Sequence, residues 1–108
     1  MSENLGELEQ LVLLALIRLG NEAYGIPVQQ ELARVAKRRA TFATVYATLQ
    51  RLEAKGFVRS RLGEPTAERG GRRKKYFEPT SLGTRALRRS IEATERMTQG
   101  IGPTWEAR

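Results

Sequence analysis

Five cations and two adjacent glycines fall within residues 69–75, a run that contains no acid. The segment before it alternates Arg59 and Arg61 with less polar residues, and the segment after it carries Tyr76 and Phe77, which is typical of β-strands. Adjacent glycines favour a reversal of the chain, so the run is expected to form the tip of a β-hairpin. Lysine and arginine side chains presented there can neutralise phosphate groups, which suits a nucleic-acid backbone better than a small-molecule pocket.

The charge of the chain is positive and unevenly distributed. Its 108 residues include 19 Lys and Arg against 12 acidic residues, all of them Glu, and the formal net charge is +7. Residues 61–75 hold six cations and two acids, a net +4. This imbalance predicts a polyanionic partner, either a nucleic acid or an anionic membrane surface, although solubility alone would be a simpler explanation.

The residue types present exclude several kinds of chemistry. The chain has no His and no Cys, so a transition-metal site, a disulfide and thiolate catalysis are not expected. No carboxylates form an obvious pair and no nucleophile stands beside a base, so we expect neither enzymatic activity nor a cofactor. The longest apolar run, residues 11–17, is shorter than the roughly 20 residues of a membrane span, and no signal peptide is evident, so a cytoplasmic protein is expected.

Three helices are expected ahead of the hairpin. Apolar spacing predicts the first over about residues 5–19 and the second over residues 26–36. The third should begin after an N-cap at Thr41 and end at the C-cap glycine Gly56. The positions expected to face inward are Leu8, Leu11, Val12, Ala15, Leu16 and Leu19 in the first helix, Val28, Leu32 and Val35 in the second, and Phe42, Val45, Leu49 and Leu52 in the third.

The first helix is apolar on more than one side, because Leu13, Leu14 and Ile17 lie outside its main stripe. Such a helix needs cover from more than one direction. Two explanations are open: it is the central helix of the core, or a second subunit covers it.

The third helix carries a second, more polar stripe. Thr44, Thr48, Arg51 and Lys55 follow the i, i+4, i+7, i+11 spacing, and small alanines stand beside them at positions 43 and 47. This spacing predicts an outward face of hydroxyls, cations and methyl groups. A face of this kind fits the DNA major groove, about 12 Å wide, where such side chains reach base edges and thymine methyls.

After the third helix, residues 58–64 and 73–78 are expected to form the two strands of the hairpin. Pro79 should close the second strand because it has no backbone N–H for a ladder. Thr80 then caps a final helix that runs to about Met97. Three helices, a strand, a cationic loop, a strand and a helix give a mainly α fold with a small β-hairpin, the winged helix-turn-helix.

Four segments resemble, in order, the signatures of PadR-type transcriptional regulators. They are residues 8–17, 23–25, 44–58 and 70–76. The resemblance implies a homodimeric winged-helix repressor that binds double-stranded DNA at an inverted repeat, and the short form of the family with one C-terminal helix. It also implies release by a small lipophilic or aromatic effector, as in many members. The expected parts are a DNA-binding domain over residues 1–80, a dimerisation helix over residues 81–99 and a flexible tail over residues 100–108.

The resemblance also implies roles for individual residues. Tyr46 matches a tyrosine that suggests a phosphate contact through its hydroxyl, although packing against the first helix explains it equally well. Ala47 and Pro79 depart from the family, which often has proline and leucine there. Trp105 lies in the expected tail, where loose docking is a better interpretation than a ligand contact. The implied recognition residues are Ala43, Thr44, Tyr46, Ala47, Thr48 and Arg51, the implied wing residues are Arg69, Gly70, Gly71, Arg72, Arg73 and Lys74, and the implied dimer residues are Leu13, Ile17, Leu87, Ile91 and Met97.

Two other interpretations belong to different classes. A winged helix can serve as a rigid adaptor that docks on an acidic protein, or as a non-specific architectural DNA-binding protein. Competition between duplex DNA and an acidic protein for the wing would separate the adaptor from the regulator.

Overall fold

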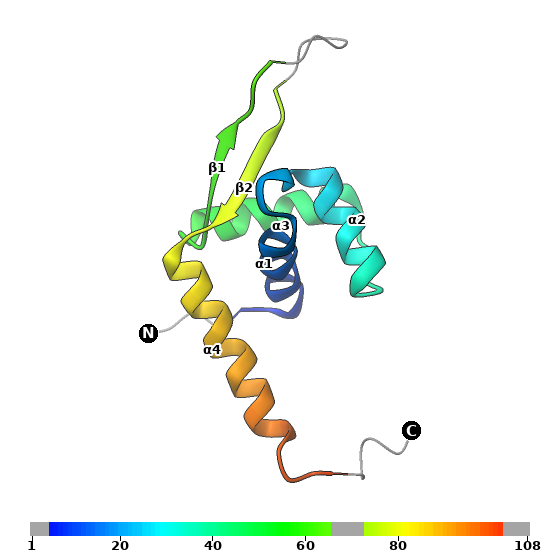
Figure 1. The fold of residues 1–108 in the computed structure, drawn as a ribbon, viewed down its shortest axis with the longest axis vertical. Coiled ribbons are helices and arrows are strands. Elements are labelled where there is room, and N and C mark those ends of the chain that lie inside the picture. Colours follow the sequence, from blue (N-terminus) through cyan, green and yellow to red (C-terminus); the bar gives the residue numbers. More distant parts are fainter. Residues whose placement is uncertain (1–4, 66–72, 103–108) are drawn as a thin grey trace.

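The computed structural model of the chain describes residues 5–65 and 73–102. Arg69, Gly70, Gly71 and Arg72 of the expected hairpin tip lie outside the described residues, and so does Trp105. Within the described part, the predicted order of elements is confirmed (Figure 1). The elements are α1 (Glu7–Leu19), a 3-10 turn η1 (Gly20–Glu22), α2 (Gly25–Val35), α3 (Phe42–Ala54), β1 (Val58–Leu62), β2 (Lys75–Pro79) and α4 (Ser81–Thr98).

The helix ends follow local capping chemistry. The Thr41 hydroxyl accepts a hydrogen bond of 3.1 Å from the Thr44 backbone N–H at the start of α3. The Thr80 hydroxyl does the same for Gly83 at the start of α4, also at 3.1 Å. Gly56 turns the chain after α3 with a φ of +82°, a conformation that disfavours residues with a Cβ. The predicted caps at Thr41 and Thr80 are confirmed, and the C-cap of α3 is Lys55, one residue before the expected Gly56.

The core is built around α1, which packs against α2, α3, β2 and α4. This central position explains why α1 is apolar on several sides: Leu13 is fully buried inside the subunit. The sequence predicted that Val35 and Phe42 face inward, and both predictions are wrong. Val35, at the end of α2, is 43% exposed, and Phe42, at the start of α3, is 45% exposed.

The two strands pair in antiparallel fashion, with Ser60 opposite Phe77 and Val58 opposite Pro79, so Pro79 is the last residue of β2. The segment just before α2 also pairs with β2. Tyr24 forms an isolated β-bridge with Tyr76, and the Phe77 N–H donates to the Ala23 carbonyl at 2.8 Å. These contacts hold β2 against the segment just before α2.

The hairpin and α4 point to opposite ends of the molecule (Figure 1). The first half of α4 is docked, because Gly83, Ala86 and Leu87 are buried, whereas residues 92–97 are all exposed. No helix in the described ranges is long and apolar enough to cross a membrane. The described residues also contain no cluster of acidic side chains that could hold a metal ion.

Candidate nucleic-acid interface

The outer face of α3 carries mainly short side chains. Ala43, Ala47, Gln50 and Ala54 are exposed and follow the i, i+4, i+7, i+11 spacing of one helix face. Thr44 and Arg51 are exposed along one edge of this face. We call these six residues the α3 outer face. It offers one amide, one hydroxyl and one guanidinium among three methyl groups.

The prediction that Thr48 faces outward is wrong, because its side chain is 0% exposed. Thr48 lies three residues after Val45 and four before Leu52, so helical geometry places it on the core side. Its hydroxyl donates to the Thr44 carbonyl at 2.8 Å and accepts a longer contact of 3.4 Å from Arg51. The hydroxyl is therefore satisfied inside the protein and is not available to a base edge.

Gln50 was missed because the expected polar stripe was centred one helical position away. Residues 43, 47, 50 and 54 are all exposed, whereas in the expected stripe Thr48 is buried and Lys55 is half-buried. The i, i+4, i+7, i+11 spacing of Gln50 with Ala43, Ala47 and Ala54 was the available signal.

Arg51 and Lys55 both meet the carboxylate of Glu9 from α1. The Lys55 ammonium donates to Glu9 Oε2 at 2.8 Å, and Arg51 Nε lies 3.5 Å from the same oxygen. Burial raises the pKa of the Glu9 carboxyl, but hydrogen bonds from Lys55 and the Gly6 N–H, with the charges of Lys55 and Arg51, lower it more. The net pKa lies below the ordinary value, so the carboxylate stays charged at neutral pH.

Tyr46 is half-buried, and its ring packs against two other aromatic rings. Its ring stacks on Phe42 with centroids 5.9 Å apart and meets Phe77 edge-on at 6.1 Å. The ring thus packs against the start of its own helix and against β2. Gly25 leaves the room for Phe42, since a Cβ at position 25 would lie 2.5 Å from its ring.

Two cations contact aromatic rings near the end of the paired strands that leads to the hairpin tip. The Arg61 guanidinium lies 4.6 Å from the Tyr76 ring centre, and the Lys74 ammonium lies 4.6 Å from that of Tyr24. The two rings meet edge-on at 5.4 Å. Tyr24 is therefore a packed residue of the segment before α2. These cation–π contacts place the guanidinium of Arg61 and the ammonium of Lys74 themselves against the rings.

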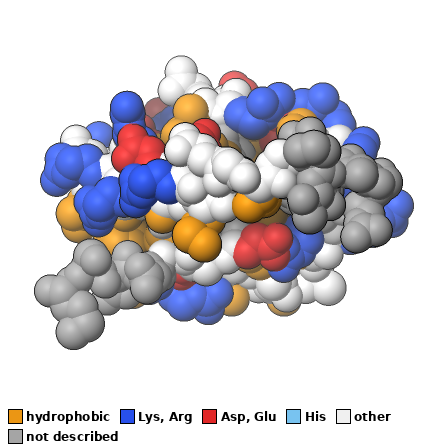
Figure 2. Space-filling model, turned by 90° about the horizontal axis from the view of Figure 1, so that it is seen from below, with side chains coloured by type: hydrophobic (Ala, Val, Ile, Leu, Met, Phe, Trp, Pro, Cys, Tyr) orange, Lys and Arg blue, Asp and Glu red, His pale blue; other side chains and the backbone are white. Residues whose placement is uncertain are grey.

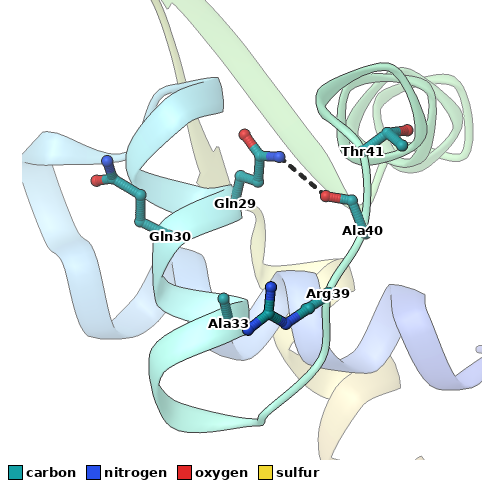
Figure 3. Close-up of a pocket in the computed structure, with 6 residues that line it drawn as sticks. All are labelled: Gln29, Gln30, Ala33, Arg39, Ala40 and Thr41. Atoms are coloured by element: carbon teal, nitrogen blue, oxygen red, sulfur yellow. Dashed lines mark hydrogen bonds between the residues drawn. The ribbon is translucent and has the colours of Figure 1, made fainter.

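A concavity of about 540 Å³ lies between α2 and the segment that joins it to α3 (Figure 3). Gln29 crosses this space and donates to the Ala40 carbonyl at 2.9 Å, which ties α2 to the connecting segment. Figure 3 shows the Arg39 side chain lying between the connecting segment and Ala33 of α2. The concavity borders Thr41, the residue that caps α3.

The residues expected at a dimer interface separate into two groups. Leu13 and Leu87, at 0% and 3% exposure, belong to the core of the subunit and have no surface to bury against a partner. Ile17 and Met97 are 50% and 78% exposed, and Ile91 is half-buried. Figure 2, seen from the end to which α4 points, shows hydrophobic side chains at the surface among Lys and Arg.

Comparison with known proteins gives a consistent result. Residues 13–89, more than half of the chain, match the family described as "Transcriptional regulator PadR-like family". No curated protein sequence matches the chain. A solved PadR family transcriptional regulator from Eggerthella lenta is 30% identical with a TM-score of 0.67, and the match covers 94% of this chain and 88% of that one.

Two further solved structures share the fold. A transcriptional regulator from Clostridium thermocellum is 24% identical with a TM-score of 0.72, over 87% of this chain and 85% of that one. Bacillus subtilis PadR in complex with operator DNA is 22% identical with a TM-score of 0.65, over 78% of this chain and 47% of that one.

Proposed function

We propose, since the chain belongs to the PadR-like family of transcriptional regulators, that it is a homodimeric repressor that binds double-stranded DNA at specific sequences. The observation that carries this proposal is the α3 outer face. A helix whose solvent side bears three alanines can approach the floor of the major groove closely. A solved relative with this fold is in complex with operator DNA.

Within the groove, Gln50 and Arg51 would provide the hydrogen bonds that distinguish bases. Glutamine pairs in bidentate fashion with adenine, and arginine does so with guanine. Ala43 and Ala47 would contact thymine methyls, and Thr44 would contact a base edge or a phosphate at the margin. Tyr46 would contact a phosphate through its hydroxyl while its ring stays packed on Phe42.

The hairpin would contact the flanking backbone. Arg73 and Lys74 lead into its tip, and both are exposed. Arg69 and Arg72 would add charge at the tip, with Gly70 and Gly71 providing the reversal between them. Phosphate contacts of this kind place the protein on the duplex without reading its sequence.

A second copy of the chain would cover the exposed apolar positions of α1 and α4. A groove of about 230 Å³ between α1 and α2 is lined largely by apolar side chains, among them Leu14 and Ile17. The exposed second half of α4 would be marginal as an isolated helix. Burying Met97 and Ile91 in the same interface would stabilise it and would join two α3 helices for an inverted repeat. A small lipophilic or aromatic effector that entered this apolar region would weaken DNA binding.

The wing proposal predicts a change in salt dependence. Arg73→Ala combined with Lys74→Ala should lower affinity for all DNA sequences and flatten the slope of log affinity against log salt by about two units, one for each lost phosphate contact. Fluorescence anisotropy over a salt titration would measure both. The control pair, Arg88→Ala with Arg89→Ala on α4, removes the same charge and should leave the slope nearly unchanged. An unaltered slope in the wing variant would exclude the wing from the interface.

The α3 outer face predicts a different kind of change. Gln50→Ala should cost about 1–3 kcal/mol with the preferred operator and far less with a duplex altered at one particular base pair. A binding series over all single base-pair changes of the operator would locate that position. Gln30→Ala, an exposed amide on α2, is the matched control. A uniform loss of affinity across the series would show that Gln50 does not read a base.

A further inference from the structure

Two polar side chains are buried in the part of the chain that the structure describes, Glu9 of α1 and Thr48 of α3. Arg51 touches both of them. A carboxylate at 7% exposure is unusual in so small a domain. DNA binding as described above assigns no task to Glu9.

The position of the Glu9 carboxylate is fixed through both of its oxygens. Oε1 accepts a hydrogen bond of 2.9 Å from the Gly6 N–H at the start of α1. Oε2 accepts the 2.8 Å bond from Lys55 and lies 3.5 Å from Arg51 Nε. Because these contacts come from two helices, the carboxylate is held at one place behind the edge of the α3 outer face.

From Arg51 the contacts continue toward the start of α3. Arg51 Nη2 donates to the Thr48 hydroxyl at 3.4 Å, and Thr48 donates to the Thr44 carbonyl at 2.8 Å. Thr41 then donates to the Thr44 hydroxyl at 3.0 Å and also caps the helix. Glu9 and Thr48 thus engage one side of a guanidinium whose side chain is 54% exposed.

We propose that Glu9 is a positioning residue that holds Arg51 in its base-reading orientation and so sets sequence preference at one base pair of the operator. This inference rests on the proposed DNA-reading role of α3. A guanidinium has five N–H donors. Glu9 lies beside Nε and the Thr48 hydroxyl accepts from Nη2, so the Nη1 and second Nη2 hydrogens would form the bidentate contact with a base.

Without Glu9, the same arginine would behave differently. A long cationic side chain on a DNA-facing helix is attracted to the nearest phosphates, and phosphate contacts carry no sequence information. The fixed carboxylate offsets part of the Arg51 charge and opposes that movement. Glu9 thereby exchanges some general affinity for discrimination between bases.

Two variants separate position from charge. Glu9→Gln keeps the size of the side chain and can still accept the Gly6 hydrogen bond, but it removes the negative charge. Glu9→Asp keeps the charge but shortens the side chain, so that it no longer reaches Arg51. The matched control is Glu7→Gln, which makes the same charge change at an exposed position of α1 whose partner is Arg38.

The measurement is the affinity ratio between the preferred operator and the duplex altered at the base pair where Arg51→Ala loses discrimination. Both Glu9 variants should lower this ratio about tenfold, a large part of what a bidentate contact provides. Glu9→Gln should also bind random duplex more tightly. In the Arg51→Ala background, neither Glu9 substitution should change the ratio further. The control Glu7→Gln should leave the ratio unchanged both in the parent and in the Arg51→Ala background.

The outcomes are distinguishable. If Arg51→Ala reduces discrimination but the two Glu9 variants keep the full ratio, Glu9 has no positioning role and the proposed function stands. If Glu9 variants lower the ratio equally with and without Arg51, their effect comes from general loss of structure and the inference is overturned. If Arg51→Ala alters no base preference at all, the assignment of Arg51 in the proposed function is itself wrong. Thermal melts establish that every variant is folded at the temperature of the binding measurement.

Discussion

Gly83→Ala should lower the free energy of unfolding by about 1–3 kcal/mol, as overpacking of a close contact does. Gly83 is buried in the first turn of α4, and a Cβ at this position would lie 2.0 Å from the Phe57 carbonyl oxygen. That carbonyl accepts the hydrogen bond of 3.0 Å from the Thr80 N–H. Because backbone stands on both sides of the contact, α4 must shift as a whole. Urea denaturation followed by circular dichroism would measure the loss.

The sign of this effect is informative because helix propensity predicts the opposite. In a helix interior, alanine is favoured over glycine by about 1 kcal/mol. The matched control is Ala93→Gly in the exposed second half of α4, which should cost that propensity difference alone. A Gly83→Ala protein that is more stable than the parent would contradict the close approach of α4 to the segment before β1.

Met97→Asp should raise the dissociation constant of the dimer by about 30-fold or more. Placing a charge at a buried interface position is expected to cost about 2 kcal/mol of binding free energy, which corresponds to this change. Met97 is 78% exposed in the subunit, so the free energy of unfolding of the monomer should change little. A monomer presents a single α3 helix, so affinity for an inverted repeat should fall steeply while affinity for one half-site is retained. Sedimentation velocity and binding to whole and half operators would measure these effects.

Leu62→Asp provides the control for Met97→Asp. Leu62 is an exposed apolar residue at the end of β1, in the hairpin that projects away from α4 (Figure 1). The same change of chemistry there should leave the oligomeric state unchanged. A Met97→Asp protein that dimerises as tightly as the parent would exclude the end of α4 from the dimer interface.

The sequence predicted the elements well because their signals are local. Thr41, Gly56 and Thr80 mark helix ends through contacts within three residues or through one backbone angle, so each could be recognised without knowledge of the fold. The alternation of Arg59 and Arg61 with less polar residues similarly predicted β1. These short-range rules were sufficient for the winged helix-turn-helix.

Which side chains point into the core and which point to solvent was harder to predict, because tertiary contacts decide it. Thr48 is polar in sequence, yet one hydrogen bond to the preceding turn satisfies its hydroxyl and permits full burial. Leu13 lies outside the main apolar stripe of the first helix, but it is buried because α1 is enclosed by other elements on several sides. The contact between Glu9 and Lys55 joins residues 46 positions apart in sequence, and no local pattern reveals such a pair.

The central claim is sequence-specific binding of duplex DNA, and selection from fragmented genomic DNA of the source organism tests it most directly. The purified protein would be mixed with the fragments near physiological salt and over a salt titration, and the bound fragments would be sequenced. We expect enrichment of one or a few fragments that share an inverted repeat, with half-sites about one helical turn apart. Salt-sensitive binding without enrichment, or displacement of bound DNA by an acidic protein, would contradict a sequence-specific regulator and favour an architectural or adaptor role.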